Sequence, residues 1–368
     1  MTETVLRRTP LFDRHAALGA RTGGFAGWDM PLQYTTPSAE HAAVRDRLGV
    51  FDVSHMGQIE VAGPGAAEAL ARALTNDIDR LPMGGGQYTL MCVDDGGVID
   101  DLIAYRLADR YLLVVNAGNV LNCVERLEAL LPAEVEWADR SWEVAMLALQ
   151  GRDWHRVLAP LVADAAALEL DYFGVAEVDV AGVPCLVART GYTGEPGVEV
   201  MCPWDGVVEL WDALMGADGA PTPAGLVARD TLRLEMGYPL YGQELSRERT
   251  PIEAGLHWAC DLEGGRFAGA QAMRAQVEAG TPERLAMFRF TEPGIPRPGH
   301  AVLSDGDPVA TVTSGTLSPT LGVGIGMAYL PTAIAAPGNP IAIDVRGSAK
   351  SAVTARRPLV DTSPKESS

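Results

Sequence analysis

The chain has 368 residues, of which 47% are hydrophobic, and it carries a formal net charge of −19. Because a single hydrophobic core stops growing at roughly 250 to 300 residues, this length predicts two or three compact units. The negative charge argues against binding to nucleic acid or to an anionic lipid surface, since both require a positively charged footprint.

The sequence also lacks the features of several other classes of protein. No stretch reaches the roughly 18 apolar residues of a membrane span, and no apolar run follows the N-terminal arginines, so we expect a cytoplasmic protein without a membrane partner. The five cysteines are scattered and form no CxxC pair, which argues against a disulfide framework and against a zinc site. Only Lys350 and Lys365 are lysines, which disfavours pyridoxal phosphate and P-loop chemistry.

Helices and strands alternate through the first third of the chain. Helices are predicted at 38–50, 63–77 and 119–131, and strands at 57–63, 87–93, 98–107 and 111–116. Pro64 is expected in the first turn of its helix. The Asp95-Gly96 step predicts a hairpin between the second and third strands. This order is typical of an α+β layer, with helices on one face of an antiparallel sheet.

A second unit of similar kind is predicted from 141 to 237. Beyond Glu283 the sequence changes to short strands separated by Gly, Pro and Ser turns, which predicts an all-β sandwich or a barrel-like domain. The polar tail 362–368 lacks apolar anchors, and we expect it to be disordered. The residues alone therefore predict two α+β units followed by a β domain.

Two adjacent carboxylates, Asp100 and Asp101, lie inside the otherwise apolar strand VIDDLIAYRL. Strand alternation predicts that Asp101 shares a face with Ile99, whereas Asp100 shares a face with Val98. At least one carboxylate must then lie among apolar neighbours, where burial raises its pKa and suits it to proton transfer or to stabilising a positive charge. The alternatives are a frayed hairpin edge or a carboxylate cluster that binds a metal.

The segment RTGYTGEPGVEV, residues 189–200, places a glycine-rich turn between two strands. Such a loop lets a flat ligand approach the backbone closely. Glu199 could accept two parallel hydrogen bonds from an amidine-like edge, such as that of a pterin. The alternative is an exposed strand glutamate.

The helix ARDTLRLEMG carries charges at helical spacing. For Arg233 and Glu235 we expect a solvated face with i, i+4 pairs. Arg229, which is expected to open this helix, could bind a carboxylate or be an ordinary surface arginine.

Asn116 ends a strand where a helix is expected to begin, so its simplest role is an N-cap. The adjacent residues Ser54 and His55 would point to opposite strand faces, which argues against a nucleophile and base pair.

Several blocks together resemble the glycine cleavage T-protein family. They are FAGWDMPLQY, FDVSHMG, GGVIDDLIAY, LLVVNAGN, RTGYTGEPGVEV, AGLVARDTLRLE, LYGQEL and TSGTLSPTLG, and they occur in the family's order over nearly the whole chain. The resemblance implies two ferredoxin-like α+β domains and a C-terminal jelly-roll-like β domain, arranged as a cloverleaf around a folate channel. The implied bounds are 1–54 with 141–242 for domain 1, 55–140 with 243–282 for domain 2, and 283–361 for the β domain.

The resemblance also assigns site residues. Asp101 matches the family's catalytic aspartate. Six positions fall where the family lines its folate pocket: Met56, Tyr88, Asn116, Tyr192, Glu199 and Arg229. For Asn116, Glu199 and Arg229 the resemblance therefore favours a binding role over the simpler alternatives.

The implied activity is that of an aminomethyltransferase. The methylene of an aminomethyl group on the dihydrolipoyl arm of a lipoylated H-protein passes to tetrahydrofolate, and ammonia is released. This chain departs from the family at Asp261, where relatives commonly have lysine, which puts partner docking near that strand in doubt. It also lacks the aromatic residue that often follows the ARRPLVD block, so the outer rim of the pocket is expected to differ from that of the family.

Two alternatives share this scaffold. One is a tetrahydrofolate-dependent demethylase of a small methylated amine or sulfonium compound, which would need no lipoyl arm. The other is a folate-binding scaffold without transferase activity. That family carries a cysteine just before its YxGQE-like block, whereas this chain reads GYPLYGQEL.

Overall fold

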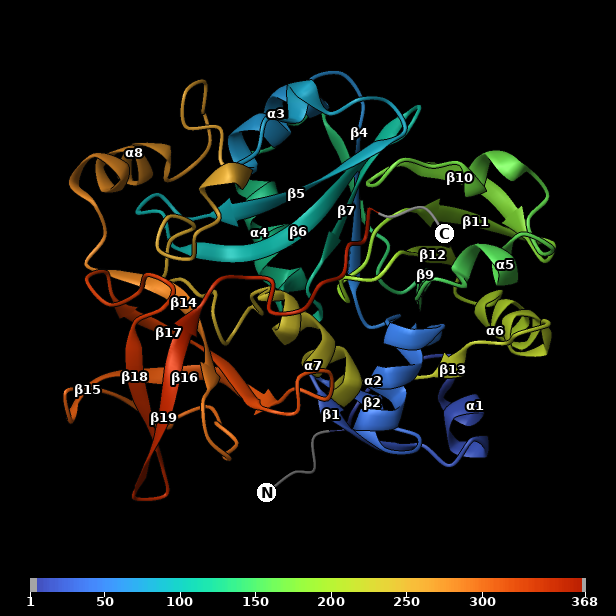
Figure 1. Cartoon of the computed structure of the whole chain (residues 1–368). Helices are drawn as coiled ribbons and strands as arrows, with labels where there is room; N and C mark the ends of the chain where they lie inside the picture. Colours follow the sequence, from blue (N-terminus) through green and yellow to red (C-terminus); the bar gives the residue numbers. More distant parts are fainter. Residues whose placement is uncertain (1–4, 366–368) are drawn as a thin grey trace.

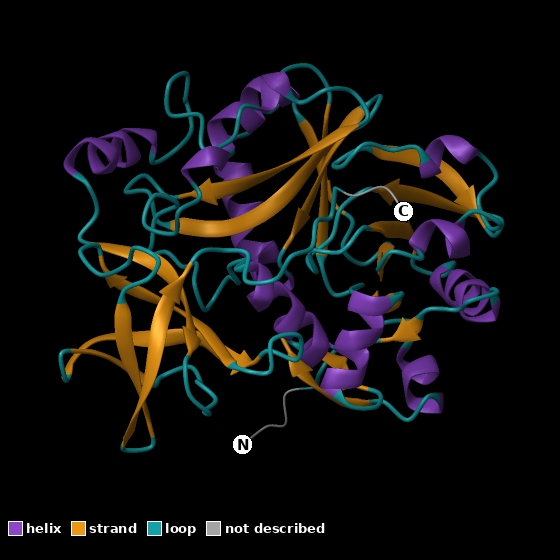
Figure 2. Cartoon of the chain, viewed as in Figure 1, coloured by secondary structure: helices purple, strands orange, loops and turns teal. Residues whose placement is uncertain are grey.

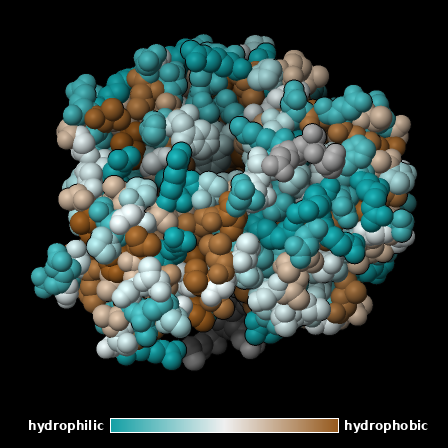
Figure 3. Space-filling view, in the orientation of Figure 1, coloured by the Kyte–Doolittle hydropathy of each residue, from teal (hydrophilic) through white to brown (hydrophobic). Residues whose placement is uncertain are grey.

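The structure is a computed structural model that describes residues 5–365, so residues 1–4 and 366–368 are left aside. Three parts surround helix α7 (Leu226–Met236), which lies near the centre of the molecule in Figure 1. Two parts combine helices with sheets, and the third consists of strands (Figure 2). Hydrophobic residues gather near the centre of the face shown in Figure 3.

The first part is a five-stranded sheet with helices packed on one face. Its strand order is β5-β6-β7-β4-β8. The strands are β4 (Gly57–Ala62), β5 (Gly85–Cys92), β6 (Val98–Arg106), β7 (Arg110–Val115) and β8 (Glu136–Asp139). The helices are α3 (Ala66–Ala73), η1 (Ile78–Arg80), η2 (Ala117–Asn119) and α4 (Val120–Leu130). Buried side chains of α3 and α4 share one core with the sheet.

The second part is a six-stranded sheet in the order β10-β11-β12-β9-β3-β13. The strands are β3 (Gly49–Asp52), β9 (Val144–Gln150), β10 (Val175–Val180), β11 (Val183–Ala188), β12 (Gly197–Pro203) and β13 (Thr222–Pro223). The helices are α1 (Phe12–Ala17), α2 (Pro37–Asp46), α5 (Trp154–Leu158), η3 (Ala165–Leu168) and α6 (Val207–Gly216). Helices α5 and α6 pack on one face of this sheet, and α2 and α7 join the core on the other.

The two sheets share a core through their inner faces. Tyr105 of β6 and Val114 of β7 pack there with Phe51 of β3 and Ala148 of β9. Loops that leave either sheet at this junction therefore lie near one another.

The third part is a closed antiparallel barrel in the order β14-β17-β16-β15-β18-β19. The strands are β14 (Glu283–Phe290), β15 (Ala301–Ser304), β16 (Asp307–Leu317), β17 (Gly324–Pro331), β18 (Pro340–Val345) and β19 (Ser348–Ala355). It is joined to the rest through η4 (His257–Ala259) and α8 (Ala270–Ala279). The predicted α+β architecture with a C-terminal β domain is confirmed, and that β domain is a six-stranded barrel.

Two local expectations need correction, and one hairpin was not predicted. The helix predicted at 38–50 ends at Asp46, since Gly49 and Val50 already belong to β3. Pro64 precedes helix α3, whose N-cap is Gly65 with a φ of 85°, a conformation that glycine adopts readily. The segment FAGWDMPLQY contributes to an antiparallel hairpin of β1 (Arg21–Phe25) and β2 (Trp28–Gln33), which periodicity did not predict.

The domain bounds given above are kept as a proposal. Sheet membership supports them, because β3 pairs directly with β9 although the strands of the five-stranded sheet lie between the two in the sequence. Of the tail 362–368 that was expected to be disordered, the Thr362 hydroxyl donates to Glu195 Oε1 at 2.8 Å, and residues 366–368 lie outside the described part of the chain. Within residues 5–365 no helix is long and apolar enough to cross a membrane.

Candidate functional site

The two aspartates point to opposite faces of β6, as predicted, but a β-bulge rearranges their neighbours. Cys92 of β5 pairs with Val98, which leaves Ile99 as the extra residue. Ile99 therefore packs in the helix-covered core, whereas Val98 packs in the core on the other side of the sheet. The prediction that Ile99 accompanies Asp101 and Val98 accompanies Asp100 is wrong, because simple alternation contains no bulge.

Asp100 is fully buried on the helix-covered face. Its carboxylate accepts hydrogen bonds from Asn116 N at 2.9 Å, Asn116 Nδ2 at 2.8 Å and Asn119 Nδ2 at 2.6 Å. The Cys123 thiol lies at 3.7 Å. Burial, and then the neighbouring charge of Asp101, raise the pKa of Asp100 to about 8.

Asp101 is half-buried on the opposite face. Its Oδ2 accepts a hydrogen bond from the Tyr88 hydroxyl at 2.9 Å, and its Oδ1 accepts one from Asn116 Nδ2 at 3.1 Å. Burial raises the pKa of Asp101 to about 6, although these hydrogen bonds favour the ionised form. Tyr88, Asp101 and Asn116, here called the aspartate group, thus come from three successive segments of one sheet. They hold a carboxylate that titrates close to neutral pH.

Glu199 lies on β12, between β11 and β9 in the six-stranded sheet. Only 6% of the residue is exposed, so the alternative of an exposed strand glutamate is wrong. Its Oε2 accepts a hydrogen bond from the Thr190 hydroxyl at 2.6 Å, and Thr190 Oγ1 lies 2.8 Å from the Tyr105 hydroxyl of the other sheet. Burial raises the pKa of Glu199, and Arg229 and Thr190 oppose that shift.

Arg229 and Tyr192 lie beside Glu199. The Arg229 guanidinium is 5.1 Å from the centroid of the Tyr192 ring, and its Nη1 is buried without a hydrogen-bond partner in residues 5–365. The Tyr192 hydroxyl donates to the Pro239 carbonyl, and its ring stacks on Tyr238 at 5.7 Å. Tyr192, Glu199 and Arg229, here called the loop group, combine an aromatic face, a carboxylate and an unsatisfied guanidinium nitrogen.

The two groups are electrostatically connected. The charges of Asp101 and Arg229 both act on Tyr192, and Asp101 and Tyr192 both act on Tyr88. The structure therefore brings both predicted groups to one junction between the sheets.

Met56 and His55 occupy the turn after β3. Met56 is half-buried and packs against the core that the two sheets share. His55 is buried with its Nδ1 unpartnered within the described chain, and burial lowers its pKa to about 4. The Ser54 hydroxyl donates to the Met146 carbonyl, which is consistent with the absence of a nucleophile and base pair.

Two other predictions for polar residues are wrong. Arg233 is 2% exposed and Glu235 is fully buried, so neither lies on a solvated helix face. Helix α7 has neighbours on several sides, including α2, β2 and the barrel strands β16 and β17. The alternative of an Asn116 N-cap is also excluded, because its side chain makes no capping hydrogen bond to η2.

Trp258 was missed by the sequence argument. It lies in η4, is 60% exposed, and stacks on Tyr88 with ring centroids 5.4 Å apart. Arg357 was missed as well; burial lowers the pKa of its guanidinium, and its neighbours Tyr329 and Tyr88 oppose that shift. A lone tryptophan and a late arginine have no local periodicity that could have linked them to a hairpin so far away in sequence.

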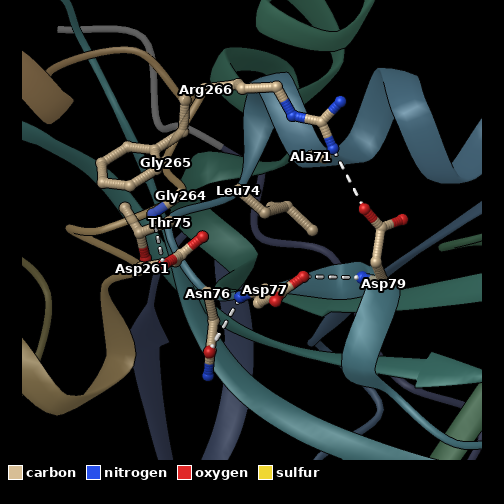
Figure 4. Close-up of a pocket in the computed structure, with 11 residues that line it drawn as sticks. Ala71, Leu74, Thr75, Asn76, Asp77, Asp79, Asp261, Gly264, Gly265 and Arg266 are labelled. Atoms are coloured by element: carbon tan, nitrogen blue, oxygen red, sulfur yellow. Dashed lines mark hydrogen bonds and ion pairs between the residues drawn. The ribbon is translucent and has the colours of Figure 1, made fainter.

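A separate surface pocket of about 250 Å³ lies beside α3 and η1 (Figure 4). It includes Asp261, whose Oδ1 accepts a hydrogen bond from Gly264 N, and Asp79, which pairs with Arg266 at 3.0 Å. No member of the aspartate or loop group lines it. Over residues 5–365 there is no group of three or more His, Cys, Asp or Glu side chains that could hold a metal ion.

Comparison with family models covers most of the chain. Residues 11–264 match the model described as the GCVT N-terminal domain, and residues 283–361 match the glycine cleavage T-protein C-terminal barrel domain.

Individual relatives are similar over their full length. The chain is 46% identical to the aminomethyltransferase of Parafrankia sp. (strain EAN1pec), covering 98% of this chain and 99% of the relative. It is 47% identical to the aminomethyltransferase of Geobacillus kaustophilus, covering 93% and 95%. The crystal structure of glycine cleavage system aminomethyltransferase T from Bartonella henselae matches with a TM-score of 0.91 at 33% identity, covering 98% and 99% of the two chains.

Proposed function

The chain belongs to the glycine cleavage T-protein family of aminomethyltransferases, and from this membership we propose how its own residues bind tetrahydrofolate and act on it. The observation that carries the proposal is Asp101, a half-buried carboxylate with a pKa near 6, held by Tyr88 and Asn116 at the junction of the two sheets.

The loop group binds the pterin. Glu199 accepts hydrogen bonds from the pterin N3–H and 2-amino group, for which a buried carboxylate is well suited. The Tyr192 ring and the unpartnered Arg229 Nη1 supply an aromatic contact and a donor. Met56 and Tyr88 complete the lining, and Asn116 contributes a polar group beside Asp101.

Asp101 acts at the reacting centre. The nitrogen lone pair of tetrahydrofolate N5 attacks the methylene carbon of the aminomethyl thioether, and N10 closes the ring. The C–S electron pair stays on sulfur, which takes a proton, and the amino group leaves as ammonia. Positive charge develops at the methylene between bond breaking and bond making. A carboxylate held nearby stabilises this charge, and it costs no reorganisation because its orientation is already fixed.

The products are 5,10-methylenetetrahydrofolate and the dihydrolipoyl carrier. The proposed partner is accordingly a lipoylated H-protein, with neither nucleic acid nor membrane involved. Tetrahydrofolate is a substrate here, and no metal or pyridoxal phosphate takes part in the proposed steps. For location, the proposal keeps the cytoplasm that the sequence led us to expect.

Ligand binding is tested by thermal melts with and without tetrahydrofolate. A ligand selective for the native state adds RT ln(1 + [L]/Kd), about 2.7 kcal/mol at a hundredfold excess over Kd. We expect the Tm to rise with tetrahydrofolate concentration. An unchanged Tm at millimolar ligand would remove the folate-binding proposal.

The methylene donor is tested separately. Purified aminomethylated H-protein and a panel of free methylated amines and sulfonium compounds are compared at equal concentration, with methylenetetrahydrofolate formation as the readout. We expect turnover with the carrier. Turnover of a free compound alone would favour the demethylase alternative.

A further inference from the structure

The starting observation is a buried carboxylate that faces away from the loop group. Asp100 lies on the helix-covered face of β6, fully buried, with no basic side chain among its hydrogen-bond donors in the described chain. An ionised carboxylate in such a place is costly unless several donors satisfy it. Two of its three N–H donors belong to a single residue, Asn116.

Asn116 connects the two aspartates. Its Nδ2 donates to Asp100 Oδ1 at 2.8 Å, to Asp101 Oδ1 at 3.1 Å and to the Asp101 carbonyl at 3.1 Å. All three acceptors lie on the same side of the amide. Its Oδ1 makes no hydrogen bond to any residue between 5 and 365.

This arrangement determines which way the amide points. Exchanging the oxygen and nitrogen of the Asn116 amide would place Oδ1 against the Asp101 carbonyl oxygen, which cannot donate in any protonation state, and would remove the Nδ2 donor from Asp100 Oδ1 and Asp101 Oδ1. The orientation follows from the network of acceptors. Only with Nδ2 turned to the aspartates does Oδ1 remain available as an acceptor.

We propose that Asp100 is a positioning residue that acts through Asn116. It fixes the Asn116 amide so that Nδ2 holds the Asp101 carboxylate and Oδ1 is presented as an acceptor to an N–H of the bound substrate. Asn119, at the start of α4, holds Asp100 in place through a hydrogen bond from its Nδ2 to Asp100 Oδ1. This inference rests on the proposed function, since it assigns to Asp100 a role in the same site without direct contact with substrate.

The consequence is that Asp100 and Asn116 are energetically coupled. Asp100→Asn replaces one carboxyl oxygen by an amide nitrogen that can only donate and that faces the donors around this side chain. The Asn116 amide then loses its preferred orientation, and Asp101 loses a fixed hydrogen bond. Because a misplacement of about 1 Å at a reacting centre can cost about a hundredfold in rate, we expect kcat/KM to fall about tenfold to a hundredfold.

The test is a double-mutant cycle of Asp100→Asn and Asn116→Ala, with kcat/KM and tetrahydrofolate Kd measured for each variant. If Asp100 acts through Asn116, then Asp100→Asn costs about tenfold to a hundredfold in the wild-type background and much less in the Asn116→Ala background. Equal losses in both backgrounds would overturn the inference, because a merely structural role would be independent of Asn116. Asp94→Asn, in the exposed turn of the same hairpin, is the matched control and should change neither quantity.

A pH profile supplies a second readout. The titratable groups that act on or are acted on by Asp100 are Asp101, Cys123, Tyr88 and Tyr241. Of these, only Asp101 titrates near neutral pH. If Asp100→Asn releases the Asn116 amide, Asp101 loses a hydrogen bond that lowers its pKa, so the acidic limb of the kcat profile should move to higher pH. An unmoved limb together with an additive cycle would exclude the positioning role.

A second variant and a ligand-binding measurement separate failure of this inference from failure of the proposed function. If Asp100→Asn does not fold, the cycle is repeated with Asp100→Glu, which keeps the carboxyl group but displaces it by one methylene. If the wild-type protein shows no Tm rise with tetrahydrofolate, the proposed function fails. If tetrahydrofolate binds and the cycle shows no coupling, only the role of Asp100 fails.

Discussion

At the scale of single residues, two neighbouring aspartates differ because of where β6 directs them. Asp100 is enclosed on the helix-covered face by donors from Asn116 and Asn119. Asp101 faces the opposite way, and its carboxylate accepts hydrogen bonds from one tyrosine hydroxyl and one side-chain amide. Burial raises the pKa of both groups, but of the two only Asp101 acts electrostatically on Tyr192 of the loop group.

The first prediction concerns Asp101→Asn. A positioned charge typically supplies about 10² to 10⁴ in rate, so kcat should fall by that order while tetrahydrofolate Kd changes little. Steady-state kinetics with binding titrations check this, and Asp94→Asn serves as the control. A variant that loses folate affinity and keeps its kcat would assign Asp101 to binding.

The same variant has a stability consequence with a definite sign. The folded pKa of Asp101, about 6, is above its ordinary value of 3.8, so the ionised carboxylate destabilises the fold once the pH rises through this range. Asp101→Asn should therefore raise the Tm of the ligand-free protein at pH 7 and have less effect at pH 4. Melts at both pH values test the sign.

The third prediction concerns Glu199→Gln. The amide presents a donor where the carboxylate accepts, so tetrahydrofolate binding should weaken by about 1 to 3 kcal/mol, roughly fivefold to 150-fold in Kd. Isothermal titration measures the effect. Glu209→Gln, on the exposed surface of α6, is the matched control. Equal affinities for both variants would contradict the assigned pterin contact.

At the scale of elements, α7 decides how the parts fit together. From this helix Glu235 reaches Arg45 of α2 at 2.9 Å and the hydroxyl of Thr320 in the barrel at 2.9 Å. Arg45 in turn donates to Glu195, which follows Tyr192 in the glycine-rich loop. One buried cluster of Arg45, Glu195 and Glu235 thereby ties α2, the loop and the barrel to α7.

The fourth prediction concerns Glu235→Gln. Burial alone would raise the pKa of Glu235, but the hydrogen bond from His41, the charges of His41 and Arg45, and the Ser318 hydroxyl lower it to about 2. Its stabilising contribution is present above the unfolded value of about 4.5 and is lost as the pH falls toward 2. The variant should be about 3 kcal/mol less stable at pH 7, because Arg45 loses one of its two buried carboxylate partners and His41 loses its own.

Denaturant melts of wild type and variant between pH 7 and pH 2.5 check that prediction. The difference in free energy of unfolding should narrow as the pH falls below 4.5. A constant difference across the range would mean that the Glu235 charge is not responsible.

At the scale of the whole molecule, the charge controls encounters with partners. Acidic residues outnumber basic ones by 48 to 29. The aspartate and loop groups lie at the junction of the two sheets, so a carrier arm must approach them through the field of the acidic protein. Long-range repulsion of an acidic partner extends over about 10 Å at 0.1 M salt and is screened as salt increases.

The fifth prediction follows from this field. For an acidic carrier protein, kcat/KM should rise as salt increases from about 10 mM to 150 mM, since screening removes repulsion that slows association. Initial rates at limiting carrier, measured across that range, test it. The kcat at saturating carrier should change little, and a falling kcat/KM would indicate a local basic docking surface.

The sequence by itself determined the features that depend on local chemistry and on the order of motifs. The Asp-Gly turn predicted the hairpin that carries both aspartates, and the motif order predicted the family and the α+β architecture with its C-terminal β domain. The proposed site residues also came from those motifs, and their roles remain predictions. Only the tertiary structure decided the rest. The bulge at Ile99 changed which residues accompany each aspartate, the packing around α7 buried Arg233 and Glu235, and the fold brought Trp258 onto Tyr88. These outcomes depend on contacts between segments far apart in the chain. Local periodicity and spacing carry no information about such contacts.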